Sequence, residues 1–379
     1  MDFALDDIQQ MLQDSASKFI QNDYGFEKRQ KLVKSELGYS EENWQLFAEL
    51  GWLALPFSEE LGGMDGGASD LMVLHTQLGK GLVVEPYLPS VVLAGKVIDR
   101  HADEEQKVPI LEALLGGELK LALAVDEPGA QNQLEKIATS AEKTADGYLL
   151  TGHKAVVLGA PSADKLVVVA RTAGEPGNTE GLSLFLVNAD QEGVKLHTYP
   201  TNDGGRAADI QFDQVKVNAD QLLGEADTAF PAIEATMNSA LVALSAEAVG
   251  IMEKLLDATV EYCKVRKQFG QPIGNFQVLQ HRMAEMFMEC EQAKSMLYFA
   301  AITVDAGGEG AGHAASLLKV KIGSAGRFVG QQAIQLHGGM GVTDELDVGH
   351  YFKRLTMINT LFGSHDEHLN RLVSQAQAA

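Results

Sequence analysis

Two stretches of the sequence combine residue types that suit the binding of an anionic cofactor. The first, VRKQFGQPIGN over residues 265–275, places Arg266 directly before a turn rich in glycine and proline. The planar guanidinium of an arginine can bind a diphosphate through two parallel hydrogen bonds in the gap between two helices. Basic side chains are also favoured at any helix C-terminus, so these residues alone leave both interpretations open.

The second stretch, QLHGGMG over residues 335–341, is rich in glycine. Gly338 and Gly339 let a backbone approach a ligand closely, and their N–H groups suit phosphate or ring acceptors. Taken alone, this pattern is weak evidence for a binding site. Its interpretation depends on the helices and strands that position it.

Hydrophobic periodicity divides the chain into three regions. Residues 1–118 show apolar spacings of three and four, which predict an N-terminal helical bundle. Residues 119–225 contain short β-branched runs such as DKLVVVAR and LSLFLVN between turn residues, which predict a compact β domain, a sandwich or a barrel. Residues 226–379 return to long helical patterns. The expected fold is therefore α+β, with a β domain between two helical domains.

Composition excludes several classes of partner. The formal net charge is −22, which argues against nucleic acid and anionic membranes. No apolar run reaches about 18 residues and the first residues are acidic, so we expect a cytoplasmic protein with no membrane segment. Cys263 and Cys290 lie among apolar neighbours as packed thiols, and the histidines show no ligand pattern beyond His365 and His368, so we expect no metal.

The segments RKQFGQPIGNFQ and QLHGGMGVTDELDVGHYFKR, in this order, resemble the paired signatures of the acyl-CoA dehydrogenase family, and the resemblance covers nearly the whole chain. It implies a C-terminal four-helix bundle, bound FAD, and oxidation of an acyl-CoA to the 2-enoyl-CoA. In that reaction a carboxylate removes the α proton while the β hydrogen leaves as hydride to the flavin. Electrons then pass to an electron-transferring flavoprotein.

The resemblance also implies cofactor contacts at matching positions. It assigns the diphosphate and adenine to one subunit's RKQFG motif and to the neighbouring subunit's QLHGG motif, which implies at least a dimer. It further assigns Ser364 to the diphosphate region and two segments of the β domain to the flavin. The expected cofactor-binding residues are Arg266, Gln268, Phe269, Gln335, Gly338, Gly339, Ser364, Val125, Asp126, Val157 and Leu158.

The chain departs from the family at the catalytic base. The loop position that usually carries a glutamate is Phe362, and the alternative position on the preceding long helix is Ala240. Neither side chain can accept a proton. The resemblance implies that the backbone N–H of the residue at the base position binds the substrate carbonyl. Phe362 still has this N–H and Gly363 follows it, so we expect these two residues to bind the carbonyl.

Glu247 is the remaining candidate for the base. It lies about 10 Å along the helix from Ala240 on nearly the same face, and its neighbours one turn away include Ala243, Leu244 and Ile251. A carboxyl on an apolar helix face is desolvated, which raises its affinity for a proton, as a general base requires. The alternative is that Glu247 forms an ion pair with an arginine from another helix or subunit.

Three functional hypotheses follow. The first is a dehydrogenase for a bulky, ring-containing or dicarboxylic acyl-CoA, similar to the small subunits of heteromeric α2β2 steroid or pimeloyl-type enzymes. Val156 replaces a usual aromatic residue, which would widen the cavity or would merely repack one loop. The second is a non-catalytic partner subunit, and the third is a flavin oxidase or monooxygenase on the same fold.

Overall fold

The structure is a computed structural model that describes the chain except residues 1–4, 131 and 379. The chain forms two compact units, each assembled from separated stretches. The helical unit contains the stretches up to Lys31, Ala68–Val83 and from Leu241 onward, and the sheet unit contains Leu32–Gly67 and Val84–Ala240.

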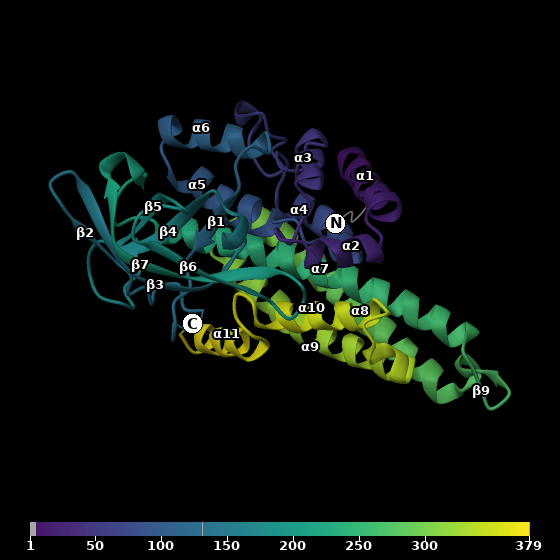
Figure 1. Ribbon diagram of the computed structural model, residues 1–379. Helices are drawn as coiled ribbons and strands as arrows, with labels where there is room; N and C mark the ends of the chain where they lie inside the picture. The colour runs from purple at the N-terminus through teal and green to yellow at the C-terminus, as the bar shows by residue number, and fades with distance from the viewer. Residues whose placement is uncertain (1–4, 131, 379) are drawn as a thin grey trace. The chain divides into compact units, whose positions relative to one another are not determined.

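Long helices dominate the helical unit (Figure 1). Helices α8 and α9 lie side by side, and α10 and α11 both pack against α9. The helices with residues in this unit are α1 (Asp7–Asp23), α2 (Phe26–Lys34), α4 (Ala68–Gly81), α7 (Phe230–Val265), α8 (Gln277–Ala306), α9 (Gly310–His337), α10 (Val348–Thr360) and α11 (His365–Ala378), together with the 3₁₀ turns η5 (Ile273–Asn275) and η6 (Gly338–Val342).

Helices α4 and α7 approach each other almost backbone to backbone. A Cβ atom on Gly79 of α4 would lie 2.2 Å from the carbonyl oxygen of Glu247, and one on Gly250 would lie 2.0 Å from that of Thr76. Both distances are far below van der Waals contact, so only glycine allows this crossing. The crossing places the segment of α7 around Glu247 directly against α4.

A tight hairpin joins α7 to α8. Strands β9 (Lys267–Gln268) and β10 (Gln271–Pro272) pair antiparallel, with Phe269 and Gly270 as the two turn residues, both at positive φ. Two consecutive residues at positive φ are the signature of a type I′ turn, which matches the twist of paired strands. Figure 1 shows this hairpin at one end of the α7–α8 pair.

The sheet unit is built around one connected sheet in the order β6-β7-β3-β2-β4-β5-β8, with β1 parallel to β4. Alternating side chains of its central strands form an apolar core that includes Leu150, Val168, Phe185 and Ile210. The strands are β1 (Leu121–Ala124), β2 (Ser140–Lys143), β3 (Gly147–Leu158), β4 (Lys165–Arg171), β5 (Leu182–Asn188), β6 (Val194–Pro200), β7 (Arg206–Asn218) and β8 (Leu222–Leu223).

Helical segments complete the sheet unit. They are α3 (Glu41–Glu49), η1 (Glu59–Leu61), the π-helix η2 (Leu88–Gly95), α5 (Lys96–His101), α6 (Glu104–Leu115), η3 (Ala160–Ser162) and η4 (Ala219–Gln221). Ser40 caps α3 by accepting a hydrogen bond from the N–H of Asn43 at 3.2 Å.

The predicted fold class is confirmed, because helical N- and C-terminal parts flank a central run of strands along the chain. The three-region division at residues 118 and 225 stays a prediction, since each compact unit draws on separated stretches. In the described part of the chain, no helix combines the length and apolarity needed to cross a membrane.

Candidate functional site

Glu247 on α7 forms a bidentate ion pair with Arg354 on α10. The Arg354 Nε lies 2.6 Å from Oε1 of Glu247, and Nη2 lies 2.7 Å from Oε2. The Glu247 side chain is only 9% exposed and that of Arg354 20%. Two parallel charge-assisted hydrogen bonds in a buried position fix the orientation of the carboxylate.

His75 of α4 adds a third polar group to this region. Burial, which has the larger effect, and the nearby charge of Arg354 together lower the pKa of the His75 imidazole to about 3. The ring is therefore neutral at physiological pH, because a second cation beside the arginine would be unfavourable. The net charge of Glu247, Arg354 and His75 is zero.

The ion pair corresponds to the alternative that the sequence left open for Glu247. Its neighbours Ala243, Leu244 and Ile251 on α7 are buried and apolar, and its cation comes from a different helix. Arg354 belongs to the stretch YFKR over residues 351–354, but no pattern in the sequence joins it to α7. The catalytic role of Glu247 stays a prediction.

The loop between α10 and α11 carries Phe362 and Gly363, both at positive φ. Its carbonyl groups are held from inside the helical unit. The Lys319 Nζ donates to the carbonyl oxygens of Ile358 and Leu361, each at 2.6 Å. The His368 Nε2 lies 2.9 Å from the carbonyl oxygen of Phe362.

The N–H groups of this loop differ in their partners. Within the described part of the chain, neither the Phe362 N–H nor the Gly363 N–H donates a hydrogen bond. The Ser364 N–H donates to Oε2 of Glu367 at 2.6 Å, and the Ser364 hydroxyl accepts from the Glu367 N–H at 3.3 Å. Ser364 therefore caps α11, and its predicted contact with a cofactor stays a prediction.

The two glycine-containing motifs lie at neighbouring helix ends. The rings of Tyr262 on α7 and His337 on α9 stack with centroids 4.4 Å apart, and the Tyr262 hydroxyl donates to the His337 carbonyl oxygen at 3.4 Å. Arg266 follows Tyr262 by one turn, and Gly338 follows His337 directly. The structure brings the two helix ends together within one chain. Which subunit's FAD each motif contacts stays a prediction from the resemblance.

These helix ends offer the features that an anionic cofactor requires. Among the described residues the Arg266 side chain, which is exposed, has no hydrogen-bonding or ionic partner. The Phe269 ring is 90% exposed, and Gly338 and Gly339 face open space. Gln268 is exposed, and Gln335 accepts the Gly338 N–H at the end of α9. A free guanidinium, an exposed aromatic ring and open backbone fit the diphosphate and adenine of FAD.

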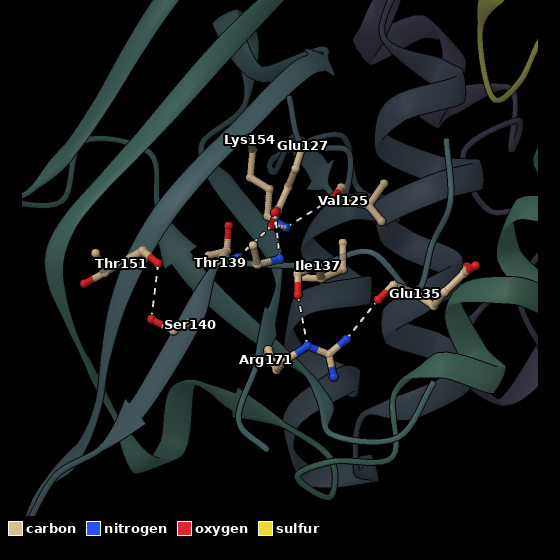
Figure 2. A network of polar contacts seen from close by, with 10 residues as sticks. Val125, Glu127, Glu135, Ile137, Thr139, Ser140, Thr151, Lys154 and Arg171 are labelled. Carbon is tan, nitrogen blue, oxygen red and sulfur yellow. Dashed lines mark hydrogen bonds and ion pairs between the residues drawn. The ribbon is translucent and has the colours of Figure 1, made fainter. Parts of the chain in front are cut away.

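In the sheet unit, a buried ion pair holds the first predicted flavin segment. The Lys154 Nζ donates to the Val125 carbonyl oxygen at 3.1 Å and to the Glu127 carboxylate at 2.7 Å (Figure 2). The Asp126 carbonyl oxygen accepts the Ala155 N–H at 2.9 Å. Burial lowers the pKa of Lys154 to about 8, and Glu127 opposes this shift. The end of β1 is thus fixed to β3.

The Glu127 carboxylate also accepts the N–H groups of Ala138 and Thr139. Close by in Figure 2, the Arg171 guanidinium donates only to backbone carbonyls among the contacts drawn, those of Ile137 and Glu135, each at 2.9 Å. Side-chain cations therefore bind described residues near both ends of the segment between β1 and β2.

The second predicted flavin segment contains a β-bulge. The register of β3 against β7 shifts between Lys154 and Val157, and Val156 has φ +51°. The Asp209 carboxylate accepts the Val156 N–H at 3.0 Å. The bulge leaves the Val156 side chain 44% exposed and buries Val157 in the sheet core at 2%. A flavin could therefore meet the backbone of Val157 and the half-buried Leu158, but not the Val157 side chain.

Comparisons with known proteins agree with these features. Residues 6–118, 122–215 and 230–376 match the N-terminal, middle and C-terminal domains of acyl-CoA dehydrogenase. The 3-(aryl)acrylate reductase of Clostridium sporogenes is 30% identical over 84% of this chain and 85% of that protein. A chain of the ChsE4–ChsE5 complex from Mycobacterium tuberculosis matches with TM-score 0.90 and 26% identity over 100% of both chains.

The FAD complex of PigA matches with TM-score 0.92 and 27% identity over 100% of this chain and 99% of the other. These matches, with the three successive domains, define a class of flavoprotein oxidoreductases. The chain belongs to the acyl-CoA dehydrogenase family. It is an FAD-dependent enzyme that acts on acyl-CoA.

The ion pair between Lys154 and Glu127 predicts a measurable stability difference. Lys154→Met leaves a carboxylate that is 7% exposed without its cation, so we expect the free energy of unfolding to fall by about 3–5 kcal/mol. Lys195→Met is the matched control, because Lys195 and Asp213 are more than 60% exposed and their loss should cost less than about 1 kcal/mol. Urea denaturation of both variants measures the difference, and equal effects would contradict a structural role for the buried pair.

Proposed function

We propose that this chain is an acyl-CoA dehydrogenase in which Glu247 removes the α proton of the substrate in place of the missing loop glutamate. The observation that carries the proposal is the burial of Glu247. Within the described part of the helical unit it is the one acidic residue with a buried side chain. FAD, when bound, supplies the acceptor of the β hydride.

Arg354 does not remove Glu247 from this role. An ionised carboxylate has about four lone-pair positions, and the two hydrogen bonds from Arg354 occupy one on each oxygen. The arginine holds the two carboxylate oxygens in a fixed plane through these two hydrogen bonds. The remaining lone pairs stay available to the α proton.

The loop residues Phe362 and Gly363 complete the proposed chemistry. Removal of the α proton develops negative charge on the thioester oxygen, and preorganised N–H donors stabilise such charge. The Phe362 and Gly363 N–H groups have no acceptor in the described structure. Loss of the loop carboxylate therefore removes the base from this position but leaves the donors for the carbonyl.

The proposed cofactor surface combines the neighbouring ends of α7 and α9. Arg266, Gln268 and Phe269 from the hairpin and Gln335, Gly338 and Gly339 from the end of α9 would bind the diphosphate and adenine. In the helical unit, the resemblance assigns Ser364 to the diphosphate region. In the sheet unit, it assigns Val125, Asp126, Val157 and Leu158 to the flavin. The contact between Tyr262 and His337 supports a single surface in one chain.

The proposed substrate is a bulky, ring-containing or dicarboxylic acyl-CoA. Exposed Val156 occupies less space than an aromatic residue would, which supports a wide cavity. One relative is named for an aryl acrylate and reduces it, the reverse of dehydrogenation. The same proposal includes an electron-transferring flavoprotein as the electron acceptor. It also includes a homo-oligomeric or α2β2 assembly and a cytoplasmic location.

A second candidate function is a partner subunit without catalytic activity of its own. Arg354 balances the charge of Glu247 in a bidentate ion pair. Phe362 occupies the position at which the family usually carries its base. One structural relative is a chain of a complex between two named components, ChsE4 and ChsE5. In this case the ion pair would be structural, and a second chain would supply the base.

Paired variants of Glu247 and Arg354 separate a base from a structural ion pair. We expect Glu247→Gln to bind FAD and acyl-CoA normally but to slow flavin reduction by about 10²- to 10⁴-fold, since it removes a general base. Arg354→Met keeps the carboxylate and should retain much more of the reduction rate. Stopped-flow absorbance under anaerobic conditions gives both rates.

Glu253→Gln is the control on the same helix, because Glu253 binds Lys80 and Lys294 and has no proposed chemical role. A purely structural pair predicts that Glu247→Gln and Arg354→Met lower the melting temperature equally and leave the reduction rate of the folded protein unchanged. That result would remove Glu247 from the mechanism.

Purification of the chain alone distinguishes the two candidate functions. A self-sufficient dehydrogenase should be yellow, and its flavin should lose its visible absorbance on anaerobic mixing with an accepted acyl-CoA. The panel should include steroid-side-chain, aryl, dicarboxylic and straight-chain thioesters, of which we expect the bulky members to react fastest. A protein with bound FAD that no thioester reduces, but that gains activity with a second chain, would instead support the partner subunit.

A further inference from the structure

The loop at Phe362 is held from one side by side chains that no proposed catalytic step uses. Lys319 of α9 is fully buried, and its ammonium donates to the carbonyl oxygens of Ile358 and Leu361. His368 of α11 lies against the carbonyl oxygen of Phe362. Two consecutive peptide groups of the loop are thus anchored through their carbonyl oxygens.

Peptide planarity determines where the N–H groups of these peptides point. All described peptide bonds are trans, so in each peptide group the N–H points opposite to the C=O. The Leu361 carbonyl points to Lys319, and the Phe362 N–H in the same peptide therefore points away from Lys319. By the same geometry the Gly363 N–H points away from His368. Both N–H groups lie on the side opposite the anchors.

The tautomer of His368 follows from its two partners. Its Nδ1 lies 3.2 Å from the Ser316 hydroxyl and its Nε2 2.9 Å from the Phe362 carbonyl oxygen. A carbonyl can only accept, so Nε2 carries the hydrogen, and Nδ1 accepts from Ser316. Burial lowers the pKa of His368 to about 4, with Arg371 and Lys319 also lowering it, while the Phe362 carbonyl and Glu367 oppose the shift. The ring is neutral in this role.

Lys319 and His368, the two anchors of the loop, both depend on one face of α9, since Ser316 of α9 binds His368. Ser316 and Lys319 are three residues apart, a spacing that places them side by side on a helix. An ammonium is costly to bury, and Glu367 is the one charged group that opposes the effect of burial on Lys319. A methionine would fill the same space without that cost. We therefore attribute the burial of Lys319 to the hydrogen bonds that its ammonium donates to the loop carbonyls.

The loop conformation is otherwise unfavourable. Phe362 at φ +57° occupies the left-handed region, which an aromatic side chain rarely adopts. A Cβ atom on Gly363 would lie 2.7 Å from Nε2 of His368, so the close approach to the anchor requires glycine. External donors on the carbonyl side offset this conformational strain.

We propose that Lys319 and His368 are positioning residues that turn the Phe362 and Gly363 N–H groups toward the thioester oxygen of a bound acyl-CoA. This inference rests on the proposed function, because it needs a substrate carbonyl at the loop. Neither side chain touches the substrate in this arrangement. They act through the orientation of two peptide groups.

The test compares Lys319→Met with Lys321→Met. Lys321 lies on the same helix but donates to the side chains of Glu289 and Gln292 and not to the loop, so its replacement controls for the loss of a lysine. The readout is the infrared carbonyl band of an acyl-CoA labelled with ¹³C at the thioester carbonyl. A second readout is the affinity for that thioester and for the matched alkyl-CoA thioether, which lacks the carbonyl oxygen.

We expect the wild type and Lys321→Met to shift the carbonyl band to lower frequency than in water. Lys319→Met should lose most of that shift and bind the thioester about three- to tenfold more weakly, with thioether affinity and FAD binding unchanged. Equal weakening for thioester and thioether, or a normal band in Lys319→Met, would overturn the proposal.

A second pair of variants tests the proposal if Lys319→Met does not fold. His368→Gln offers a side chain that can still donate to the Phe362 carbonyl, whereas His368→Leu cannot. We expect the carbonyl shift to be retained in the first variant and reduced in the second, and the same shift in both would overturn the role of His368. If even the wild type shows no shift, the proposed carbonyl site itself fails, which distinguishes that failure from a failure of the anchors.

Discussion

The pairing of Glu247 with Arg354 is the constraint on which the rest of the helical unit depends. A carboxylate on a buried helix face is tolerated only when a cation and good hydrogen-bond geometry compensate its lost hydration. Arg354 supplies both from α10, so α7 and α10 must be held in a fixed register. Gly79 and Gly250 allow α4 to pack closely enough on α7 to bury the same region. Because α10 continues into the loop at Phe362, the element that binds the proposed base also positions the proposed carbonyl donors.

Backbone carbonyls held by buried lysines recur in both units. In the sheet unit Lys154 holds the Val125 carbonyl, and in the helical unit Lys319 holds that of Leu361. Burial lowers the pKa of each lysine, to about 8 and about 7 respectively. Each lysine fixes an irregular segment for which the family resemblance predicts ligand contacts. The shared logic is that a regular strand or helix orders itself through its own hydrogen bonds, whereas an irregular segment needs donors from elsewhere.

The sequence predicts local features well because their causes are local. Periodicity separates helical from β regions, and the residues Phe269 and Gly270 fall within the predicted breaker turn between α7 and α8. Features that depend on contacts between residues distant in sequence cannot be predicted from periodicity or from local motifs. The partner of Glu247 lies on another helix, and the bulge at Val156 reverses the alternation that would otherwise place Val157 outward. The anchors Lys319 and His368 carry no motif at all, since their role arises only when α9, α10 and α11 pack together.

We propose that proton abstraction has moved from the loop at Phe362 to Glu247, while the loop keeps its carbonyl donors. Deuterium incorporation at the α carbon of an acyl-CoA in D₂O measures this step without requiring an electron acceptor. Mass spectrometry of the recovered thioester should show exchange with the wild-type protein and none above background with Glu247→Gln. Exchange at the wild-type rate in Glu247→Gln would contradict the account and would assign the base to another residue or to a partner chain.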